Sequence, residues 1–303
     1  MYISVIIPNY NGVELLRKYL VPNYEILKKI FLKQFELIIT DDGSKDQSEE
    51  YVIGLKLSQI RFIKHKGIRG FGNNCNFAAA QAVGDVLFLL NNDVKLDISI
   101  SFLTEKLLSP DVFAVVPRII RPLQDNTNES ITFAKIKYYG IDFDHLNMLQ
   151  KDENHDALVL WACGAATICK KDIFNTLGGF SKEFNPFYVE DADLSMKAWR
   201  KGYKSIYIAQ ARVFHYHNAT IPKLVSRRKI ETLFKRNKYI YLFKHFSKDS
   251  HLLPLKIVLF HIITLHLLEL WYIFLAVIRL QRENQKYEAS GLQILSRIKE
   301  NAL

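Results

Sequence analysis

The amino-acid sequence predicts an α/β fold: a mostly parallel sheet flanked by helices, with a C-terminal helical extension. Short apolar runs alternate with helical patterns over the first 116 residues, and each run is apolar throughout. Such runs are typical of parallel strands that are buried on both faces. The last 83 residues look helical and carry no strand signal, which predicts the extension.

Each expected element follows from its local pattern. Strands are expected at residues 3–7, 36–40, 60–63, 85–90 and 113–116. The helices between them are expected at residues 13–30, 47–57, 72–83 and 98–108. Residues 121–158 are polar and irregular, which predicts a long connection with one or two short strands. A second ordered block follows, with strands at 158–169 and 205–208 and helices at 171–177 and 191–201.

Cysteine content and charge bound the class of protein. Three scattered cysteines without a CxxC pair predict neither a disulfide framework nor a zinc site, and they favour a reducing compartment such as the cytoplasm. A strand-like run begins at residue 2, so we expect no signal peptide ahead of it. The net charge is +10, and residues 221–303 contribute +9 through 15 basic and 6 acidic residues. This asymmetry predicts an anionic partner surface for the extension.

An apolar run within the extension bears on that partner. Residues 257–278 form a 22-residue stretch close to the length that spans a bilayer. His261, His266 and Glu269 lie within it, however, and such groups are costly at the centre of a bilayer. We therefore favour an interfacial helix or helical hairpin on an anionic membrane surface, with a transmembrane span and an oligomer contact as alternatives. The basic flanks carry no nucleic-acid motif, so nucleic acid is not expected as a partner.

Polar residues gather where the expected strands end. Ligands of parallel sheets bind at the carboxyl ends of the strands, which nominates the loops that start at Pro8, Asp41 and Asn91. The adjacent carboxylates of Asp41 and Asp42 suit hydrogen bonding to a ribose or a base edge, although Asp42 would also suit capping of the next helix. Asp93 follows a buried strand and is placed to hold a divalent cation, although Asn and Asp are also common turn residues.

Two further segments carry ionisable groups. Glu190 and Asp191 lie at the start of an expected helix, where acidic residues interact favourably with the helix dipole. Asp191 is also placed to act as a general base that removes a proton from an attacking hydroxyl. His215 and His217 are two residues apart, on the same side of an extended chain.

In their order and spacing these segments resemble glycosyltransferase family 2, a group with the GT-A fold, and bacterial rhamnosyltransferases and galactosyltransferases carry similar blocks. The resemblance covers about residues 2–245. It rests on SVIIPNYNG, DDGS, GFGNNCNFAAAQAVGD with Asn76 at the family's characteristic asparagine, LLNNDV, a block that ends in YVEDADLSMKAW, and ARVFHYHNAT.

The resemblance assigns roles to particular residues. The nucleotide-binding residues would be Pro8, Asn9, Tyr10, Asp41, Asp42, Asn73 and Asn92. Asp93 and His215 would hold a divalent cation, Mg²⁺ or Mn²⁺, that bridges the diphosphate, and Asp191 would be the catalytic base. The acceptor pocket would be shaped by Trp161, Gly164 and Glu190. One departure is that Asn91 stands where the family's metal motif has its first Asp, which leaves Asp93 as the carboxylate of that motif.

The implied activity is inverting transfer of a sugar from a UDP- or dTDP-linked donor to a hydroxyl of a glycan or lipid-linked acceptor, in envelope polysaccharide synthesis. Residues 1–220 would be the catalytic domain, with the nucleotide-sugar half at 1–116 and the acceptor half at 117–220. Residues 221–303 would associate with the inner face of the cell membrane or form a homo-oligomer. Two alternatives are a nucleotidyltransferase of similar fold, although PNYNG lacks that class's Arg or Lys, and a non-catalytic nucleotide-sugar-binding scaffold.

Overall fold

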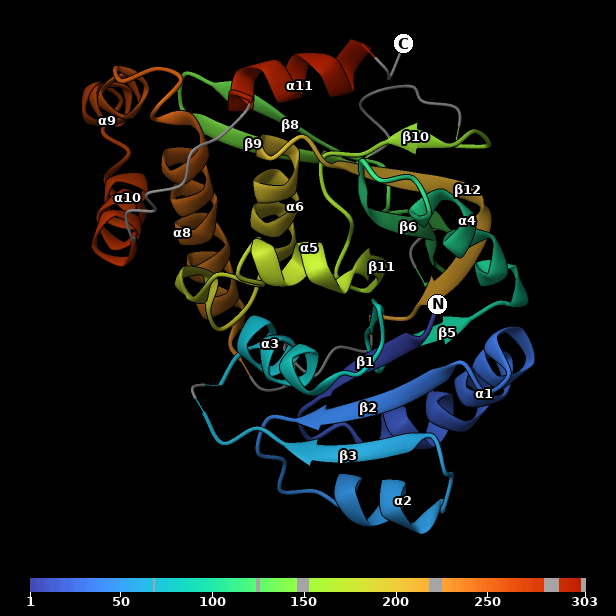
Figure 1. The fold of residues 1–303 in the computed structure, drawn as a ribbon. Helices are drawn as coiled ribbons and strands as arrows, with labels where there is room; N and C mark the ends of the chain where they lie inside the picture. The colour runs from blue at the N-terminus through green and yellow to red at the C-terminus, as the bar shows by residue number, and fades with distance from the viewer. Residues whose placement is uncertain (68, 124–125, 146–152, 218–224, 281–288, 301–303) are drawn as a thin grey trace.

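A ten-stranded sheet runs through the molecule in the strand order β10-β12-β6-β11-β4-β1-β2-β3, with β5 and β7 attached to β12 and β6 (Figure 1). The structure is a computed structural model that describes the chain except residues 68, 124–125, 146–152, 218–224, 281–288 and 301–303. The predicted α/β class with flanking helices and a helical extension is confirmed. The sheet is parallel from β4 to β3 and mixed beyond β4.

The first half of the chain folds as predicted. The strands are β1 (Ile3–Asn9), β2 (Phe35–Asp41), β3 (Ile60–Lys64) and β4 (Val86–Leu90). The helices are α1 (Val13–Phe31), α2 (Ser48–Gly54) and α3 (Phe71–Gln81). Right-handed crossovers put α1 and α2 on one face of the sheet. Helix α3 lies on the other face, because the chain moves back across the sheet from β3 to reach β4 on the far side of β1. The strand order therefore switches between β1 and β4, where ligands of such sheets bind.

The second half departs from the predicted boundaries. Its strands are β5 (Val94–Leu96), β6 (Val112–Arg121), β7 (Thr127–Asn128), β8 (Thr132–Lys137), β9 (Gly140–His145), β10 (Ala157–Leu158), β11 (Ala166–Lys170) and β12 (Lys204–His215). The expected strand at 158–169 is divided between β10, which ends at Leu158, and β11, which begins at Ala166. Between them the backbone N–H groups of Trp161 and Ala162 bond the hydroxyls of Thr132 and Ser195. The expected strand at 205–208 lengthens and reaches His215.

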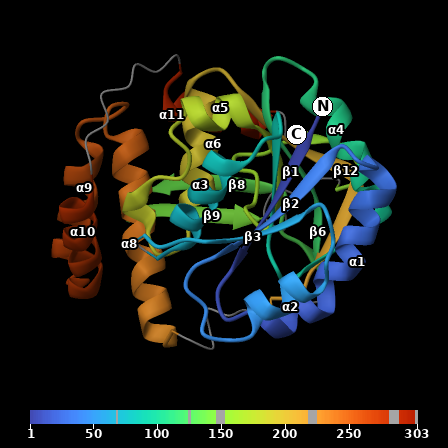
Figure 2. The ribbon, with the colours of Figure 1, turned by 60° about the horizontal axis from the view of Figure 1, so that its bottom comes forward.

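Shorter helices and the C-terminal extension complete the chain. The helices of the body are η1 (Ile98–Phe102), α4 (Leu103–Leu107), α5 (Lys171–Thr176), η3 (Lys182–Phe184) and α6 (Glu190–Arg200). Those of the extension are α8 (Arg227–Phe246), α9 (Leu253–Ile263), α10 (Leu267–Arg279) and α11 (Gly291–Glu300). Figures 1 and 2 both show α8 beside α6, with α9 and α10 outside α8. The body and the extension share a hydrophobic core that includes Trp161, Trp199 and Tyr241.

The long apolar run of the extension is two helices. Leu265 has a φ of 56°, in the left-handed region, and it lies between α9 and α10. Among the described residues, no helix combines the length and the apolar character that a bilayer crossing requires. Of the two forms that we favoured, an interfacial helix or a helical hairpin, the run forms two helices joined by a turn, and its contact with a membrane stays a prediction.

The carboxylate of Asp193 joins the body to the extension. It is fully buried on α6 and lies 3.0 Å from Lys244 Nζ and 2.9 Å from His245 Nε2, both on α8. Its other oxygen accepts a hydrogen bond from Ser181 and lies 3.7 Å from Lys197 Nζ. Burial raises the pKa of Asp193, but the lysines and His245 outweigh burial and hold this pKa well below its usual value. Asp193 is therefore a structural residue, unlike its neighbour Asp191 in our prediction.

We expect Asp193→Ala to lower the free energy of unfolding by about 3–5 kcal/mol, because it leaves buried cations without their counter-ion. Urea denaturation followed by circular dichroism measures this change. The matched control is Asp111→Ala, which removes an exposed partner of Lys204 and should cost about 1 kcal/mol or less. Equal losses for the two variants would contradict the role given to Asp193.

Candidate active site

The side chain of Asn9, at the end of β1, links the loops that follow three neighbouring strands. Its amide nitrogen donates to Asp41 Oδ1 over 3.0 Å, at the end of β2. Its amide oxygen accepts from Asn92 Nδ2 over 3.1 Å, in the loop after β4. Asn9 is 2% exposed, so both bonds are shielded from water. Three of the predicted nucleotide-binding residues are thereby brought together at the switch in strand order.

Gly12 packs against this link. A Cβ atom at this position would overlap the amide oxygen of Asn9 and lie 2.5 Å from the amide nitrogen of Asn92. Real Cβ atoms do not approach other atoms so closely, so any larger residue must push the two amides apart. The glycine of the PNYNG loop is therefore required by close approach of side chains.

The acidic pair after β2 closes loops rather than capping the next helix. Asp41 Oδ2 accepts hydrogen bonds from the backbone N–H groups of Gly43 and Ser44, at 3.1 and 2.8 Å. Asp42 accepts from the backbone N–H of Gly70 at 2.9 Å and contacts His65 Nδ1 at 2.9 Å. Both carboxylates are buried, and neither of them caps α2.

Three other predicted nucleotide-binding residues border this region. Tyr10 is half-buried, and the Arg69 guanidinium lies 5.0 Å above its ring and donates to its hydroxyl. Pro8 lies in β1 opposite Thr40 of β2, and Asn73 is half-buried on α3. The ring of Tyr10 stacks on the Arg69 guanidinium, and a nucleobase could take the place of Arg69 on the same ring face.

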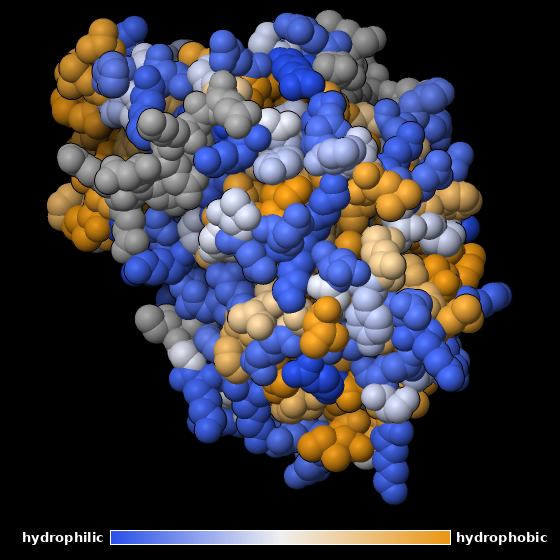
Figure 3. Space-filling model, viewed as in Figure 1, coloured by the Kyte–Doolittle hydropathy of each residue, from blue (hydrophilic) through white to orange (hydrophobic). Residues whose placement is uncertain are grey.

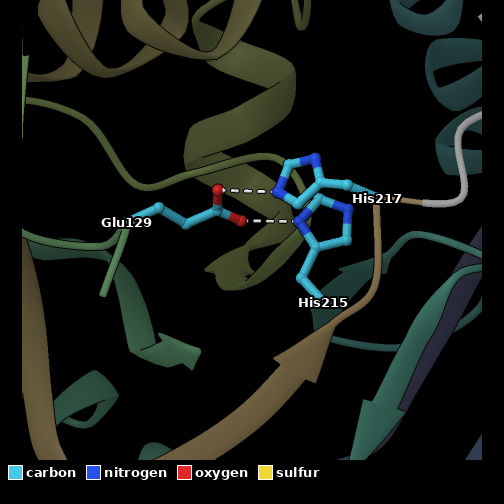
Figure 4. Close-up of side chains that lie close together, drawn as sticks. All are labelled: Glu129, His215 and His217. Atoms are coloured by element: carbon cyan, nitrogen blue, oxygen red, sulfur yellow. Dashed lines mark hydrogen bonds and ion pairs between the residues drawn. The ribbon is translucent and has the colours of Figure 1, made fainter. Parts of the chain in front are cut away.

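Asp93 and His215 meet as predicted, and a third residue joins them. Asp93 Oδ1 lies 3.1 Å from His215 Nε2, and both side chains are buried. Glu129 Oε1 lies 2.5 Å from the other ring nitrogen of His215, and Glu129 Oε2 lies 2.9 Å from His217 Nε2 (Figure 4). The line of contacts thus runs from Asp93 through His215 and Glu129 to His217.

The charges in this cluster reinforce one another. Burial lowers the pKa of His215, but its bonds with Asp93 and Glu129 outweigh burial and raise this pKa to about 9. Burial raises the pKa of Glu129, but His215 and His217 outweigh it and lower this pKa to about 2. Both ring nitrogens of His215 therefore face carboxylates, and a divalent cation bound beside Asp93 would take the place of the proton on Nε2.

The donor set fits a divalent cation. Asp93 and His215 offer a buried carboxylate oxygen and a buried imidazole nitrogen 3.1 Å apart, and both are ligand types that divalent cations bind. A carboxylate on the far nitrogen of a metal-ligating imidazole fixes the orientation of the ring, and Glu129 has that position. Glu129, His215 and His217 form a second possible set, with ligand atoms within 4.8 Å of one another.

Asp191 is anchored next to the loop that carries Asp93. Its Oδ2 accepts a hydrogen bond from the backbone N–H of Gly164 over 3.1 Å. The next residue, Ala165, accepts a backbone bond from Asn91 over 2.8 Å. Consecutive residues of one segment therefore hold the predicted base and the predicted metal loop. A Cβ at Gly164 would make only ordinary van der Waals contact with Asp191, at 3.7 Å, so close packing against Asp191 does not by itself require glycine here.

The chain enters α6 through strained backbone. Tyr188 and Val189 have φ angles of 77° and 74°, a region that non-glycine residues rarely adopt and that is often found at functional sites. The amide nitrogen of Asn237, buried on α8, lies 2.8–3.0 Å from the carbonyl oxygens of Phe184, Phe187 and Tyr188. The extension therefore holds the loop that precedes Asp191.

The remaining predicted acceptor residues are largely enclosed. Glu190 is 8% exposed, and its Oε2 has no hydrogen-bond partner among the described residues. Burial, and then the charge of Asp191, raise the pKa of Glu190 well above its usual value. Trp161 is 6% exposed and packs edge-on against Phe143. An unpartnered buried carboxyl beside Asp191 is a group that a ligand hydroxyl can satisfy.

Sequence reasoning missed Glu129 and Asn237. Glu129 lies in the polar connection after β6, and Asn237 lies among the basic residues of α8, so neither stands out from its neighbours. The sequence carries only an indirect signal for Glu129: a histidine that is buried needs a polar partner, and neither His215 nor His217 has an obvious one nearby in the sequence. Asn76, singled out by resemblance alone, has a structural role, because its side chain exchanges two hydrogen bonds with the backbone of Phe180.

The fold and this site define the class of protein. The solved structure of GalNAc-T7 with UDP, GalNAc and Mn²⁺ superposes with a TM-score of 0.61 at 17% identity, over 80% of this chain and 48% of that one. The mannosyltransferase PcManGT of Pyrobaculum calidifontis with GDP-Man and Mn²⁺ has a TM-score of 0.56 at 19% identity, over 91% and 73%. The fold is that of GT-A glycosyltransferases.

The sequence comparisons place the chain within that class. The profile of glycosyl transferase family 2 matches residues 4–174, and that of glycosyl transferase family group 2 matches residues 103–281. The chain belongs to glycosyl transferase family 2.

Three curated relatives are similar over nearly three quarters of the chain. The O-antigen chain rhamnosyltransferase RfbN of Salmonella typhimurium is 27% identical over 73% of this chain and 68% of its own length. The O-antigen biosynthesis protein RfbC of Myxococcus xanthus is 25% identical over 72% of this chain. Protein y4gI of Sinorhizobium fredii is 24% identical over 72% of this chain. The matched region spans only 25% of y4gI and 17% of RfbC.

We expect Gly12→Ala to lower the free energy of unfolding by about 1–3 kcal/mol, because its Cβ must displace the Asn9–Asn92 bond. Thermal unfolding measures the change. Gly54→Ala is the matched control, since nothing lies within 4 Å of the added Cβ and its effect should be neutral or stabilising. If Gly12→Ala were as stable as that control, the close packing around Asn9 would not exist.

Proposed function

We propose that this chain is an inverting glycosyltransferase that moves a sugar from a nucleotide-diphosphate sugar to a hydroxyl of a glycan or lipid-linked acceptor. The observation that carries the proposal is the set of contacts from Asp41 through Asn9 to Asn92, which is followed in the chain by Asp93 and its contact with His215. Asp191 is anchored beside these contacts through Gly164. A nucleoside, a diphosphate and a reacting sugar need such groups in this order.

Donor binding is assigned to the half formed by residues 1–116. Pro8, Tyr10 and the buried acids Asp41 and Asp42 surround the nucleoside, with Asn9, Asn73 and Asn92 along the rim. Asp41 keeps the turn closed, so its carboxylate is positioned before any ligand arrives. A UDP- or dTDP-linked sugar is the donor class that we propose, supported by the UDP and UDP-GlcNAc named with similar GT-A structures.

Asp93 and His215 are the residues that we assign to a divalent cation, and Mn²⁺ is named with two of the similar structures. Such a cation neutralises the charge that grows on a leaving diphosphate. Glu129 keeps the Nε2 atom of His215 directed at Asp93 by holding the opposite ring nitrogen. Asn91 lies in the same turn and offers a neutral oxygen where the resemblance expects a carboxylate.

Asp191 is the proposed base. It takes the proton of the acceptor hydroxyl as that oxygen attacks the sugar carbon from the face opposite the diphosphate, which inverts the anomeric configuration. Burial, and then the charge of Asp191, raise the pKa of the neighbouring Glu190 and so favour its neutral form. A neutral carboxyl donates a hydrogen bond to the acceptor without competing for its proton. Trp161 and Gly164 limit the space in which that acceptor lies, within the half formed by residues 117–220.

The acceptor that we propose is a growing envelope polysaccharide or its lipid carrier. The O-antigen roles named for RfbN and RfbC support this class. An enzyme that acts on such a carrier would work on the cytoplasmic face of the cell membrane, as a peripheral protein attached through residues 221–303, and self-association through those helices is the alternative use.

We expect Asp191→Asn to lower the rate of sugar transfer by roughly 10²–10⁴-fold, because the amide cannot accept the acceptor proton. Release of nucleoside diphosphate from a panel of UDP- and dTDP-sugars, with Mn²⁺ and an envelope glycan fraction as acceptor, measures the rate. Affinity for UDP should change by less than about twofold, since Asp191 lies outside the assigned nucleoside site.

Asp156→Asn is the matched control, because Asp156 is an exposed carboxylate that pairs with Lys106. It should transfer at the wild-type rate. If Asp191→Asn transferred sugar at nearly the wild-type rate, Asp191 would not be the catalytic base. Binding of nucleotide sugar without any diphosphate release by the wild type would favour the non-catalytic scaffold, and release of pyrophosphate from a nucleoside triphosphate would favour a nucleotidyltransferase.

We expect Asp93→Asn and His215→Ala each to weaken Mn²⁺ binding in the presence of UDP by more than about tenfold, because each removes a ligand. Glu129→Gln should weaken it by roughly 10–100-fold through the orientation of His215. The free Mn²⁺ signal in electron paramagnetic resonance measures binding independently of catalysis.

His217→Ala is the discriminating variant. Because His217 contacts Glu129 rather than Asp93, we expect its effect to stay below about fivefold. A loss in His217→Ala as large as that in His215→Ala, with Asp93→Asn unaffected, would place the ion between Glu129, His215 and His217 instead.

A further inference from the structure

The hairpin of α9 and α10 directs two of its polar residues, His261 and Glu269, toward the rest of the protein. His261 is 3% exposed, and its Nε2 lies 2.8 Å from the carbonyl oxygen of Tyr139 and 3.1 Å from the hydroxyl of Tyr239. Glu269 accepts hydrogen bonds from Lys235 over 2.6 Å and from Tyr239 over 2.9 Å. Two of the three groups that would be costly in a bilayer are therefore satisfied within the protein, whereas His266 is exposed in the turn between the helices.

Apolar residues cover the outer surface of the same hairpin. Of the 23 large hydrophobic residues that are exposed in the described parts of the chain, 12 lie between residues 252 and 278. They are Leu252, Leu255, Leu259, Ile262, Ile263, Leu265, Leu267, Leu268, Trp271, Phe274, Val277 and Ile278. Figure 3 shows hydrophobic side chains along the edge where Figure 1 places α9 and α10. Contiguous exposed apolar surface of this kind marks an interaction site.

We propose that this apolar face docks on a membrane surface that carries anionic lipids. Positive charge favours an anionic membrane as the partner. Residues 221–303 carry a net charge of +9, and Lys256 and Arg279 of the hairpin are exposed. Two copies of the chain that met through this face would bring like charges together, whereas anionic headgroups neutralise them. The proposal does not depend on the sugar-transfer chemistry.

The hairpin lies in the interface and does not cross the bilayer. Helices α9 and α10 have 11 and 13 residues, which at 1.5 Å per residue makes them about 16 and 20 Å long, against about 30 Å of hydrocarbon. Leucine, phenylalanine and tryptophan on one side, with basic residues at the margin, are typical of helices that lie in the headgroup region. The inward-facing Glu269 stays with its protein partners in this arrangement.

The chain contains a reporter for this docking. Of its three tryptophans, Trp161 and Trp199 are 6% and 2% exposed, whereas Trp271 is 51% exposed on the apolar face. The test titrates the full chain with vesicles of phosphatidylglycerol and phosphatidylcholine, and records tryptophan fluorescence and co-sedimentation. We expect a blue shift of the emission and sedimentation with the vesicles, both weaker on pure phosphatidylcholine vesicles and at high salt.

The matched variants keep Trp271. Leu259→Gln/Ile263→Gln/Ile278→Gln changes outer residues of the hairpin that are 46%, 77% and 67% exposed, and should weaken vesicle binding by roughly tenfold or more. Ile53→Gln/Val83→Gln/Leu108→Gln changes equally exposed residues elsewhere, at 61%, 70% and 73%, and should bind as the wild type does. Release of diphosphate from the donor in solution should be unchanged in both triple variants.

Three results would overturn the proposal. The first is a wild-type chain that neither sediments nor shifts its emission with anionic vesicles. The second is equal binding by the two triple variants. The third is a dimer in analytical ultracentrifugation that the hairpin variant alone converts to a monomer, without any vesicle binding, which would assign the face to a second copy.

Discussion

The buried amide of Asn9 is the interaction on which the site depends. One side chain bonds Asp41 of the second strand and Asn92 of the turn that carries Asp93, and so sets the spacing between the proposed nucleoside and metal regions. An amide suits this place because it donates and accepts at once, whereas a carboxylate or a hydrophobic group would leave one partner unsatisfied in a buried position. Gly12 lies against the Asn9–Asn92 bond, where a Cβ atom would come within 2.5 Å of both amides.

The C-terminal extension helps to build the candidate active site. Asp193 bonds Lys244 and His245 of α8, and Asn237 of the same helix holds the strained loop that leads into Asp191. Left-handed backbone at two consecutive non-glycine residues persists only where the surroundings hold it. Because those surroundings come from the extension, the position of the proposed base depends on residues more than 40 positions further along the chain.

The extension also has two sides with opposite chemistry. Helix α8 packs on the body through apolar residues such as Tyr241 and through the ion pair of Lys244 with Asp193, and the α9–α10 hairpin exposes apolar side chains on its outer surface. In a helix that packs on a core the apolar stripe faces inward. The outer apolar side chains of the hairpin are additional to that stripe, and His261 and Glu269 form their hydrogen bonds on the protein side of the hairpin.

Sequence patterns alone determined the fold class, the four parallel strands and the residues at their carboxyl ends, because apolar periodicity and strand-end position are properties of neighbouring residues. They also singled out Asp93, His215 and Asp191 by resemblance. Only the tertiary structure decided which groups face each other. Glu129 bonds His215, which is 86 residues further along the chain. The expected strand at 158–169 is interrupted where backbone N–H groups bond side-chain hydroxyls. The apolar run at 257–278 forms a hairpin of two helices. Contacts of such separation leave no local pattern, since a buried polar group is satisfied by whichever partner the fold brings to it.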